Sequence, residues 1–187
     1  MNILIIFGPP GSGKGTQSKL ISKNLNYLHF STGEQLRAEV SKGTELGKEI
    51  DSLISKGKFV PNELSTEITR NFIILNKEKN ILLDGFPRNL KQAENLLEIL
   101  KELKIEDTKI INLEVNDNEI IKRLLLRAKI ENRKDDNEET IKERIKIYHN
   151  ETKKVLDFLK EKDMKIINVN GEGDIQEIQK EILKKIR

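Results

Sequence analysis

The chain has 187 residues, of which 36 % are hydrophobic and 35 % charged, with 34 Lys and Arg against 31 Asp and Glu. This length suits a single α/β domain, and a net charge of +3 with only 4 % aromatic residues argues against a nucleic-acid-binding surface, which concentrates basic and aromatic side chains. Because the sequence contains no cysteine, disulfides and cysteine-ligated zinc are excluded.

Short apolar runs alternate with longer helical patterns along the chain. The runs are rich in Ile, Val and Leu without clear alternation, which is typical of strands buried on both faces of a parallel sheet. Strands are predicted at Ile3–Phe7, Tyr27–Phe30, Asn80–Leu83, Lys109–Val115 and Lys165–Val169. Helices are predicted at Lys14–Asn24, Gly33–Lys42, Leu46–Lys56, Asn62–Leu75, Leu90–Lys101, Asn118–Leu126, Glu138–Glu161 and Ile175–Ile186. This order predicts a three-layer α/β fold, with a five-stranded parallel sheet and helices on both faces.

The first apolar run, residues 3–7, is too short for a signal peptide or a membrane span and has no charged leader. We therefore expect a cytoplasmic protein without a membrane partner. Since no apolar helix face exceeds the needs of one core, we also expect a monomer.

A glycine-rich segment, Gly8–Thr16 (GPPGSGKGT), follows the first predicted strand and opens the first helix. In this context a GxxxxGK match indicates a phosphate-binding loop. Glycines let backbone N–H groups surround a phosphate, the helix N-terminus adds partial positive charge, and Lys14 adds a full one. We therefore assign triphosphate binding to the loop residues Gly11, Ser12, Gly13, Lys14, Gly15 and Thr16.

Two regions interrupt the alternation of strands and helices. Residues 32–77 contain helical patterns alone, and residues 127–137 are polar and dense in charge. Neither can contribute much to a sheet core, so we expect both to lie over the carboxyl edge of the sheet, where α/β folds bind ligands. We divide the chain into a core (residues 1–30, 61–126 and 138–187), a helical insert (31–60) and a short lid (127–137).

Arginines are rare in this lysine-rich chain, and their positions are informative. A guanidinium offers a planar fork of donors and stays charged when desolvated, so it suits phosphate recognition. Those expected near the proposed site are Arg37, Arg88, Arg123, Arg127, Arg133 and Arg144. Arg70 and Arg187 are interpreted as surface charges. Without ligand, we expect the clustered cations to repel one another, so that the insert and the lid open.

The motifs together resemble the adenylate kinase family, and the resemblance covers essentially the whole chain. The segments that carry it are GPPGSGKGTQ (Gly8–Gln17), STGEQLR (Ser31–Arg37), GKFVP (Gly57–Pro61), DGFPR (Asp84–Arg88) and RKDD (Arg133–Asp136). The resemblance implies the P-loop NTPase fold and reversible, Mg²⁺-dependent transfer of the γ-phosphoryl group of ATP to AMP, giving two ADP. Because Gly15 stands where other phosphate loops have a Mg²⁺-ligating Ser or Thr, it also implies that Mg²⁺ is held through water, helped by Asp84. The lid is the short type, so no zinc site is expected.

The resemblance implies roles for single residues around AMP. Thr32 and Gln92 would contact the adenine, and backbone at residues 58–60 would line its pocket. Arg37 and Arg88 would hold the phosphate. The full set implied for AMP is Thr32, Arg37, Lys58, Phe59, Val60, Gly85, Phe86, Pro87, Arg88, Gln92, Arg133 and Arg144.

Around ATP, the resemblance implies that Arg123 packs on the adenine, that Arg127 contacts the phosphates and that the backbone of Gly173 meets the adenine. Arg133 and Arg144 would bridge both substrates. Catalysis would depend on Lys14, Arg88, Arg123, Arg127, Arg133 and Arg144. A phosphate acceptor is already anionic, so no general base is needed, and His29 and His149 are interpreted as structural.

Two alternatives remain at this point. UMP/CMP kinases share the expected fold and chemistry and also resemble the chain at Asn89, but they usually have Ala at the position of Thr32 and Asn at that of Gln92. A P-loop switch or regulatory ATPase would have one nucleotide site and no second phosphate clamp, so Arg37 and Arg88 argue against it.

Overall fold

The computed structural model describes residues 1–131, 133 and 135–186. Asn132 and Lys134, which belong to the predicted lid, and Arg187, interpreted as a surface charge, lie outside the described residues. The strands are β1 (Ile3–Phe7), β2 (Leu28–Ser31), β3 (Ile81–Asp84), β4 (Thr108–Glu114) and β5 (Lys165–Asn170). They form one parallel, five-stranded sheet in the order β2-β3-β1-β4-β5, which confirms the predicted α/β class.

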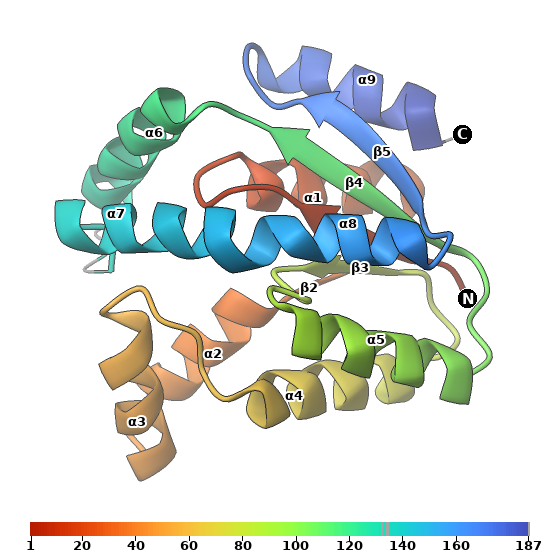
Figure 1. The fold of residues 1–187 in the computed structure, drawn as a ribbon, viewed down its shortest axis with the longest axis horizontal. Coiled ribbons are helices and arrows are strands. Elements are labelled where there is room, and N and C mark those ends of the chain that lie inside the picture. Colours follow the sequence, from red (N-terminus) through yellow and green to blue (C-terminus); the bar gives the residue numbers. More distant parts are fainter. Residues whose placement is uncertain (132, 134, 187) are drawn as a thin grey trace.

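Helices cover both faces of this sheet (Figure 1). They are α1 (Lys14–Leu25), α2 (Thr32–Ser41), α3 (Glu45–Ile54), α4 (Asn62–Leu75), α5 (Leu90–Glu102), α6 (Asp117–Ile130), α7 (Glu138–Ile147), α8 (Lys153–Glu161) and α9 (Ile175–Ile186). As predicted, the chain between β2 and β3 contains only helices. Most boundaries fall within one or two residues of those predicted, because the apolar periodicity marks each element clearly.

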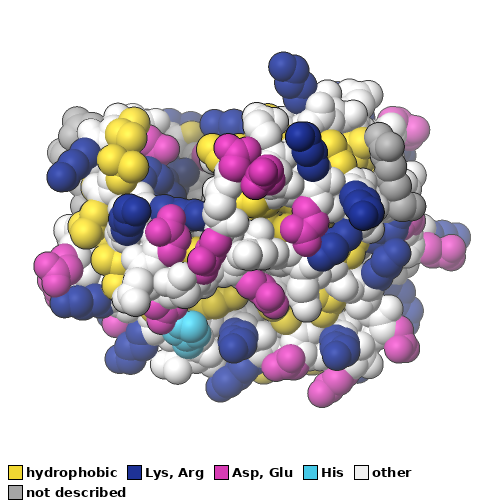
Figure 2. Space-filling model, turned by 90° about the horizontal axis from the view of Figure 1, so that it is seen from above, with side chains coloured by type: hydrophobic (Ala, Val, Ile, Leu, Met, Phe, Trp, Pro, Cys, Tyr) yellow, Lys and Arg dark blue, Asp and Glu magenta, His cyan; other side chains and the backbone are white. Residues whose placement is uncertain are grey.

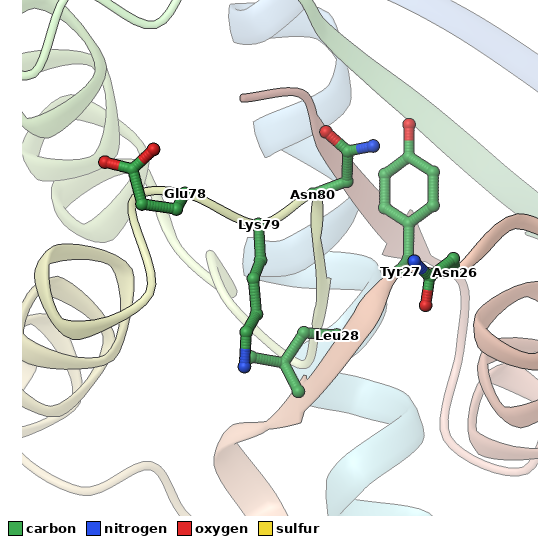
Figure 3. A pocket seen from close by; sticks show the side chains of 6 residues that line it. All are labelled: Asn26, Tyr27, Leu28, Glu78, Lys79 and Asn80. Atoms are coloured by element: carbon green, nitrogen blue, oxygen red, sulfur yellow. The ribbon is translucent and has the colours of Figure 1, made fainter.

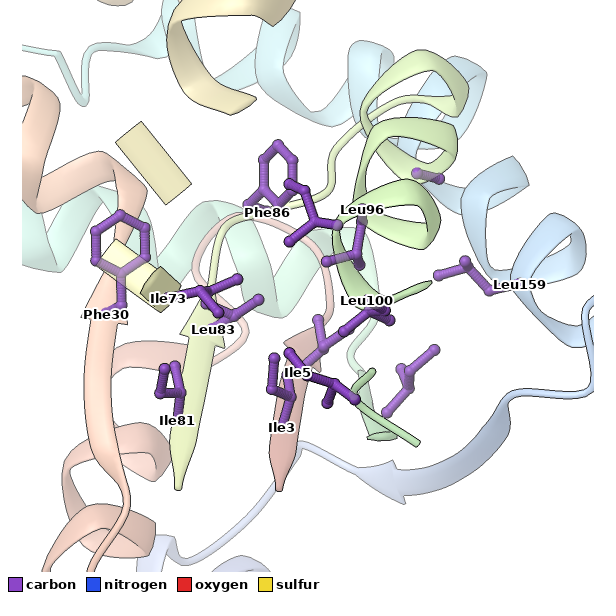
Figure 4. Close-up of a cluster of buried hydrophobic side chains, with 14 of the residues drawn as sticks. Ile3, Ile5, Phe30, Ile73, Ile81, Leu83, Phe86, Leu96, Leu100 and Leu159 are labelled. Atoms are coloured by element: carbon purple, nitrogen blue, oxygen red, sulfur yellow. The ribbon is translucent and has the colours of Figure 1, made fainter. Parts of the chain in front are cut away.

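The central strands β1 and β3 are buried along their whole length, as their unbroken apolar sequences predict. Odd-numbered side chains of β1, such as Ile3 and Ile5, join a core with α4, α5 and α8, which Figure 4 shows in close-up. Even-numbered ones, Leu4 and Ile6, join a second core with α1 and α9 on the other face. The phosphate loop leaves the carboxyl end of β1 between these two layers.

Two details differ from the prediction. In the edge strand β5, buried and exposed residues alternate, because α9 covers the face with Ile167 and Val169 whereas Asn168 and Asn170 on the other face are exposed. The helix predicted over residues 138–161 is interrupted by a π-helical turn, η1 (Tyr148–Thr152), between α7 and α8. In this turn the hydroxyl of Thr152 donates a hydrogen bond to the carbonyl of Arg88, at 2.8 Å, so the irregular turn faces the proposed site.

The strands point toward the end of the molecule where α2, α3, α6 and α7 lie, and both termini are at the opposite end (Figure 1). Positive and negative side chains are interspersed over the face in Figure 2, as the composition predicts. None of the helices in the described part of the chain has the length and apolarity needed to cross a membrane.

Candidate active site

The phosphate loop between β1 and α1 has the backbone that anion binding requires. Gly11 and Gly13 have φ of 76° and 92°, a left-handed conformation that favours glycine. A Cβ on Gly11 would lie 2.8 Å from Leu124 of α6, whereas one on Gly13 would meet nothing within 4 Å. Gly13 caps α1 without a side-chain hydrogen bond, so the first N–H groups of the helix remain available for an anion.

Lys14 extends from the first residue of α1 back across the loop. Its ammonium donates hydrogen bonds to the carbonyls of Gly8 and Pro9, each at 2.8 Å. The pKa of Lys14 is lowered to about 8, chiefly by burial; Asp84 opposes the shift, and the nearby cations Arg88 and Arg127 contribute to it. Burial and two neighbouring positive charges disfavour the charged form of this amine, and a bound phosphate would stabilise it. Lys14 therefore lies at the centre of a strongly positive site.

Asp84 ends β3 beside the phosphate loop and is the best candidate for a Mg²⁺ contact. Asp84 is only 8 % exposed. Its Oδ2 lies close to Gly15 of the loop, 3.8 Å from the position that a Cβ on that glycine would occupy. His29 Nε2 lies 3.4 Å from the same oxygen. No cluster of three potential ligands among His, Cys, Asp and Glu occurs within the described residues. One carboxylate beside a phosphate site fits Mg²⁺, which keeps several waters and binds mainly through substrate phosphates.

Arg88 and Arg37 form a second cationic centre next to this one. Arg88 Nε donates to the carbonyl of Gly85 at 2.7 Å, and a Cβ on Gly85, where φ is 85°, would lie only 2.7 Å from Arg88 Nη2. An ideal Cβ on Gly33 would lie 3.2 Å from Arg37 Nη1 and 3.8 Å from Arg88 Nη2, so the two guanidiniums converge there. Burial lowers the pKa of Arg88 to about 10, and burial also lowers that of Arg37. In the part of the chain that the structure describes, neither guanidinium forms an ion pair.

The residues expected around a base lie next to Arg88. The hydroxyl of Thr32 is buried and has no hydrogen-bond partner among the described atoms, so its hydrogen-bonding capacity is available to a ligand. The ring of Phe59 lies 5.9 Å from the Arg88 guanidinium, while Val60 is buried and Lys58 is exposed.

Three other residues expected to contact AMP have side chains that pack or form hydrogen bonds within the protein. The side chain of Phe86 is buried in the core, so only its backbone remains for a ligand, and Pro87 follows it through a cis peptide bond. Gln92 is also buried, and its amide makes hydrogen bonds to several neighbours.

The lid arginines are paired with acids, which corrects one expectation. Arg127 binds both carboxylate oxygens of Asp136, at 2.6 and 2.8 Å, and Arg144 binds Asp136 at 2.8 Å. Arg133 and Arg144 both donate to Asp135, at 2.8 and 2.5 Å. Burial opposes ionisation of Asp135, but these hydrogen bonds and charges hold its pKa well below its usual range. The expected repulsion among the lid arginines is therefore wrong, because Asp135 and Asp136 neutralise them.

The helix that follows the lid touches the helical insert. The hydroxyl of Thr140 on α7 donates to the carbonyl of Ser55 at 3.1 Å, and Arg144 Nη2 lies 3.5 Å from the carbonyl of Ile54. Gly57 makes this approach possible, since a Cβ there would lie 3.1 Å from both Arg144 Cγ and the carbonyl of Thr140. The insert and the lid region thus meet across the site.

Arg123 links α6 to the loop after β5. Its Nε donates to Glu119 at 2.7 Å and its Nη1 to the carbonyl of Gly171 at 2.9 Å. Gly173, with φ of 106°, is exposed, and space is open on its Cβ side. Arg123 therefore lies beside the loop that contains Gly173.

Two cavities lie outside the phosphate loop, one beside Asn89 and Leu90 and one at the far edge of the sheet. One of about 360 Å³ is lined by residues 26–28 and 78–80, which precede β2 and β3, so it opens at the amino edge of the sheet (Figure 3). This is the edge opposite the phosphate loop.

The structure adds three residues to those considered from the sequence. From the sequence, Asp135 and Asp136 were considered only as part of the RKDD motif. Two acidic residues close to four arginines could have predicted the ion pairs that the structure shows. His29 was interpreted as structural, but it faces Asp84, and the parallel pairing of β2 with β3 brings the two together. His149 pairs with Asp117 at 3.0 Å on the surface, in keeping with a structural role.

Comparisons with known proteins agree on one family. The family model described as adenylate kinase matches residues 6–164. An adenylate kinase of Leptospira biflexa is 44 % identical over 187 residues, covering 100 % of both chains. Similar proteins include adenylate kinases of Parabacteroides distasonis, 44 % identical over 94 % of this chain and 92 % of that one, and of Corynebacterium urealyticum, 40 % identical over 96 % of each.

Proposed function

The chain belongs to the adenylate kinase family, and on that premise we propose that it transfers the γ-phosphoryl group of ATP to AMP, yielding two ADP. The observation that carries the proposal is a pair of guanidiniums beside the phosphate loop of Lys14, those of Arg37 and Arg88, which form no ion pair with any described residue. One loop explains a triphosphate, but a second desolvated cationic centre needs a second anion. A nucleoside monophosphate supplies it. The family match does not favour the UMP/CMP alternative.

The catalytic effect in this proposal is positioning and charge neutralisation. The acceptor phosphate is already anionic, so no residue has to remove a proton. Lys14 and Arg88 hold the two phosphates on either side of the transferring group, and Arg127 and Arg133 of the lid and Arg144 of α7 supply further positive charge to it. Such residues act by stabilising charge in an in-line transition state.

Arg123 and Gly173 are proposed to contact the adenosine of ATP, and Thr32, Gln92 and residues 58–60 that of AMP. Mg²⁺ is proposed to accompany ATP, with Asp84 holding it through water. When bound there, the ion neutralises phosphate charge and orients the phosphates. The residues present fit this role, because the Asp84 carboxylate lies beside the phosphate loop. Among the described residues it forms no ion pair with a lysine or an arginine.

We also propose the division into core, insert (31–60) and lid (127–137). A separate hydrophobic cluster of Leu36, Ile50 and Val60 supports the insert as a unit that can move. Closure of both regions over the substrates would exclude water and so prevent hydrolysis of ATP. A monomer in the cytoplasm remains our proposal for the state and place of the protein.

The test is a coupled assay with ATP and, in turn, AMP, UMP, CMP, GMP and dTMP. We expect AMP to give the highest kcat/KM. Arg88→Lys keeps the charge but loses the planar fork, and it should lower kcat/KM for AMP by about 10²- to 10³-fold. Arg70→Lys is the matched control, because Arg70 pairs with Glu102 on the surface, and it should have no effect. ATP hydrolysis that no monophosphate stimulates would instead indicate a one-site switch.

A further inference from the structure

The loop that carries Gly173 joins β5 to α9, and its first half is fixed to β4 and α6. The backbone N–H of Gly171 donates to the carbonyl of Glu114 at 2.8 Å. Glu172 Oε1 accepts hydrogen bonds from the backbone N–H of Asn116 at 2.9 Å and from its Nδ2 at 2.6 Å. Asn116 is the N-cap of α6, so this half of the loop is held at the start of that helix.

The second half of the loop is held by α1, the helix that begins at the phosphate loop. Gln17 lies in the first turn of α1, where its backbone N–H donates to the carbonyl of Gly13 at 2.9 Å. Its side-chain Nε2 donates to the carbonyl of Ile175, the first residue of α9, at 3.0 Å. Because a carbonyl can only accept, the amino group of Gln17 and not its oxygen faces α9. Gln17 thus connects Gly13 of the phosphate loop to the loop of Gly173.

A second buried glutamine, on α9, makes no comparable bond. Helices α1 and α9 pack against each other on one face of the sheet. Gln179 follows Ile175 by one turn and is 3 % exposed, but neither polar atom of its amide has a hydrogen-bond partner among the described atoms. Gln17, at 2 % exposed, is buried to the same extent. Burial of a glutamine therefore does not by itself link these helices, and Gln17 differs by reaching the carbonyl at the start of α9.

We infer that Gln17 holds the loop of Gly173 in place relative to the phosphate loop, so that the two loops bind one ATP molecule, the phosphates at one and the adenosine at the other. The inference rests on the proposed function, since it takes Gly173 as a contact of the ATP adenosine. Gly173 has no side chain to anchor it, and its φ of 106° favours glycine. Its place is therefore decided by the contacts of its neighbours, among them Ile175. Two loops that are already placed for one ligand lose less freedom when the ligand binds, so their spacing contributes to affinity.

Gln17 is therefore a positioning residue, and Gln17→Met removes its hydrogen bond without leaving a cavity. Methionine has a similar length and volume and favours a helix, but it has no donor for Ile175. Gln17→Leu removes the donor with an apolar side chain of different shape and should give the same result. Gln179→Met is the matched control, because it makes the same exchange at a similarly buried position whose amide has no hydrogen-bond partner among the described atoms. Urea unfolding shows that each variant is folded.

The experiment measures, by calorimetry, Kd for ATP and for inorganic tripolyphosphate, which can occupy the phosphate loop but has no adenosine. In Gln17→Met, Kd for ATP should rise about 5- to 10-fold, the value of one hydrogen bond, while Kd for tripolyphosphate does not change. Gln179→Met should bind both ligands as wild type does. In the coupled assay, KM for ATP should rise in Gln17→Met, while kcat and KM for AMP keep their wild-type values, because the phosphates are held as before.

Three results would overturn the inference. If Kd for tripolyphosphate rises as much as Kd for ATP in Gln17→Met, Gln17 supports the phosphate loop alone. If Kd for ATP is unchanged in both Gln17 variants, the hydrogen bond to Ile175 does not affect binding. If Gln179→Met weakens ATP binding as Gln17→Met does, the cause is altered packing between α1 and α9. Binding of ATP needs no acceptor, so the calorimetric result stands even if wild type phosphorylates no monophosphate, which is the outcome that would refute the proposed function.

Discussion

Replacing Lys14 with methionine should abolish turnover and at the same time leave the protein as stable as wild type, or more stable. The substitution keeps an unbranched chain of similar length at the start of α1 but removes the ammonium. In the folded protein that ammonium is half-buried, and it is stabilised by the carbonyls of Gly8 and Pro9. Both carbonyls can bind water instead once the charge is gone.

The magnitude follows from the pKa of Lys14. Burial lowers it from 10.5 to about 8, and at about 1.4 kcal/mol per pKa unit this corresponds to ~3 kcal/mol of destabilisation at pH 7. Partial solvent screening and the two lost hydrogen bonds reduce the net gain for Lys14→Met to about 1–2 kcal/mol. Because the folded pKa lies below the unfolded one, the unfolded chain binds more protons between the two values. The destabilisation is therefore complete below about pH 8 and disappears as the pH rises toward 10.5.

Urea unfolding of wild type and Lys14→Met at pH 7 and at pH 10 measures this difference, and the coupled assay measures turnover. We expect kcat to fall by about 10²-fold or more, and kcat/KM of wild type for ATP to decline above about pH 8, as the free enzyme loses the charge. A Lys14→Met protein that is less stable than wild type at pH 7 would show that the ammonium is a structural contact. Near-normal kcat in the folded variant would refute the catalytic assignment.

Asp136→Asn should lower the free energy of unfolding by about 3 kcal/mol, because two arginines lose a buried carboxylate; an unchanged urea midpoint would contradict this pairing. Thr32→Ala combined with Gln92→Asn should shift kcat/KM from AMP toward UMP or CMP by ~1–3 kcal/mol, and an unmoved ratio would place base recognition elsewhere. Two adenosines joined by five phosphates should bind more tightly than ATP or AMP, since both sites are engaged at once. Hydrogen exchange should then show protection in residues 31–60 and 127–137, and protection of the second range alone would remove the proposed AMP site.

Much of the fold follows from local sequence. The runs of Ile, Val and Leu in β1 and β3 predict strands buried on both faces, and the structure confirms them. The phosphate loop is equally local, because glycine positions, the helix start and Lys14 are adjacent in the chain. The π-helical turn within residues 138–161 has no signal in the local sequence, and the hydrogen bond from its Thr152 to Arg88 joins residues far apart in the chain.

The sequence by itself determined the class of fold, the phosphate loop and the identity of the arginines, because each depends on neighbouring residues or on residue type. Only the tertiary structure decided which arginines are neutralised. Asp136 lies close in sequence to three arginines, yet Arg88 and Arg37 remain without a carboxylate partner in the described chain. Charge pairing depends on distances of a few ångströms between elements that fold together, and no local pattern encodes those distances.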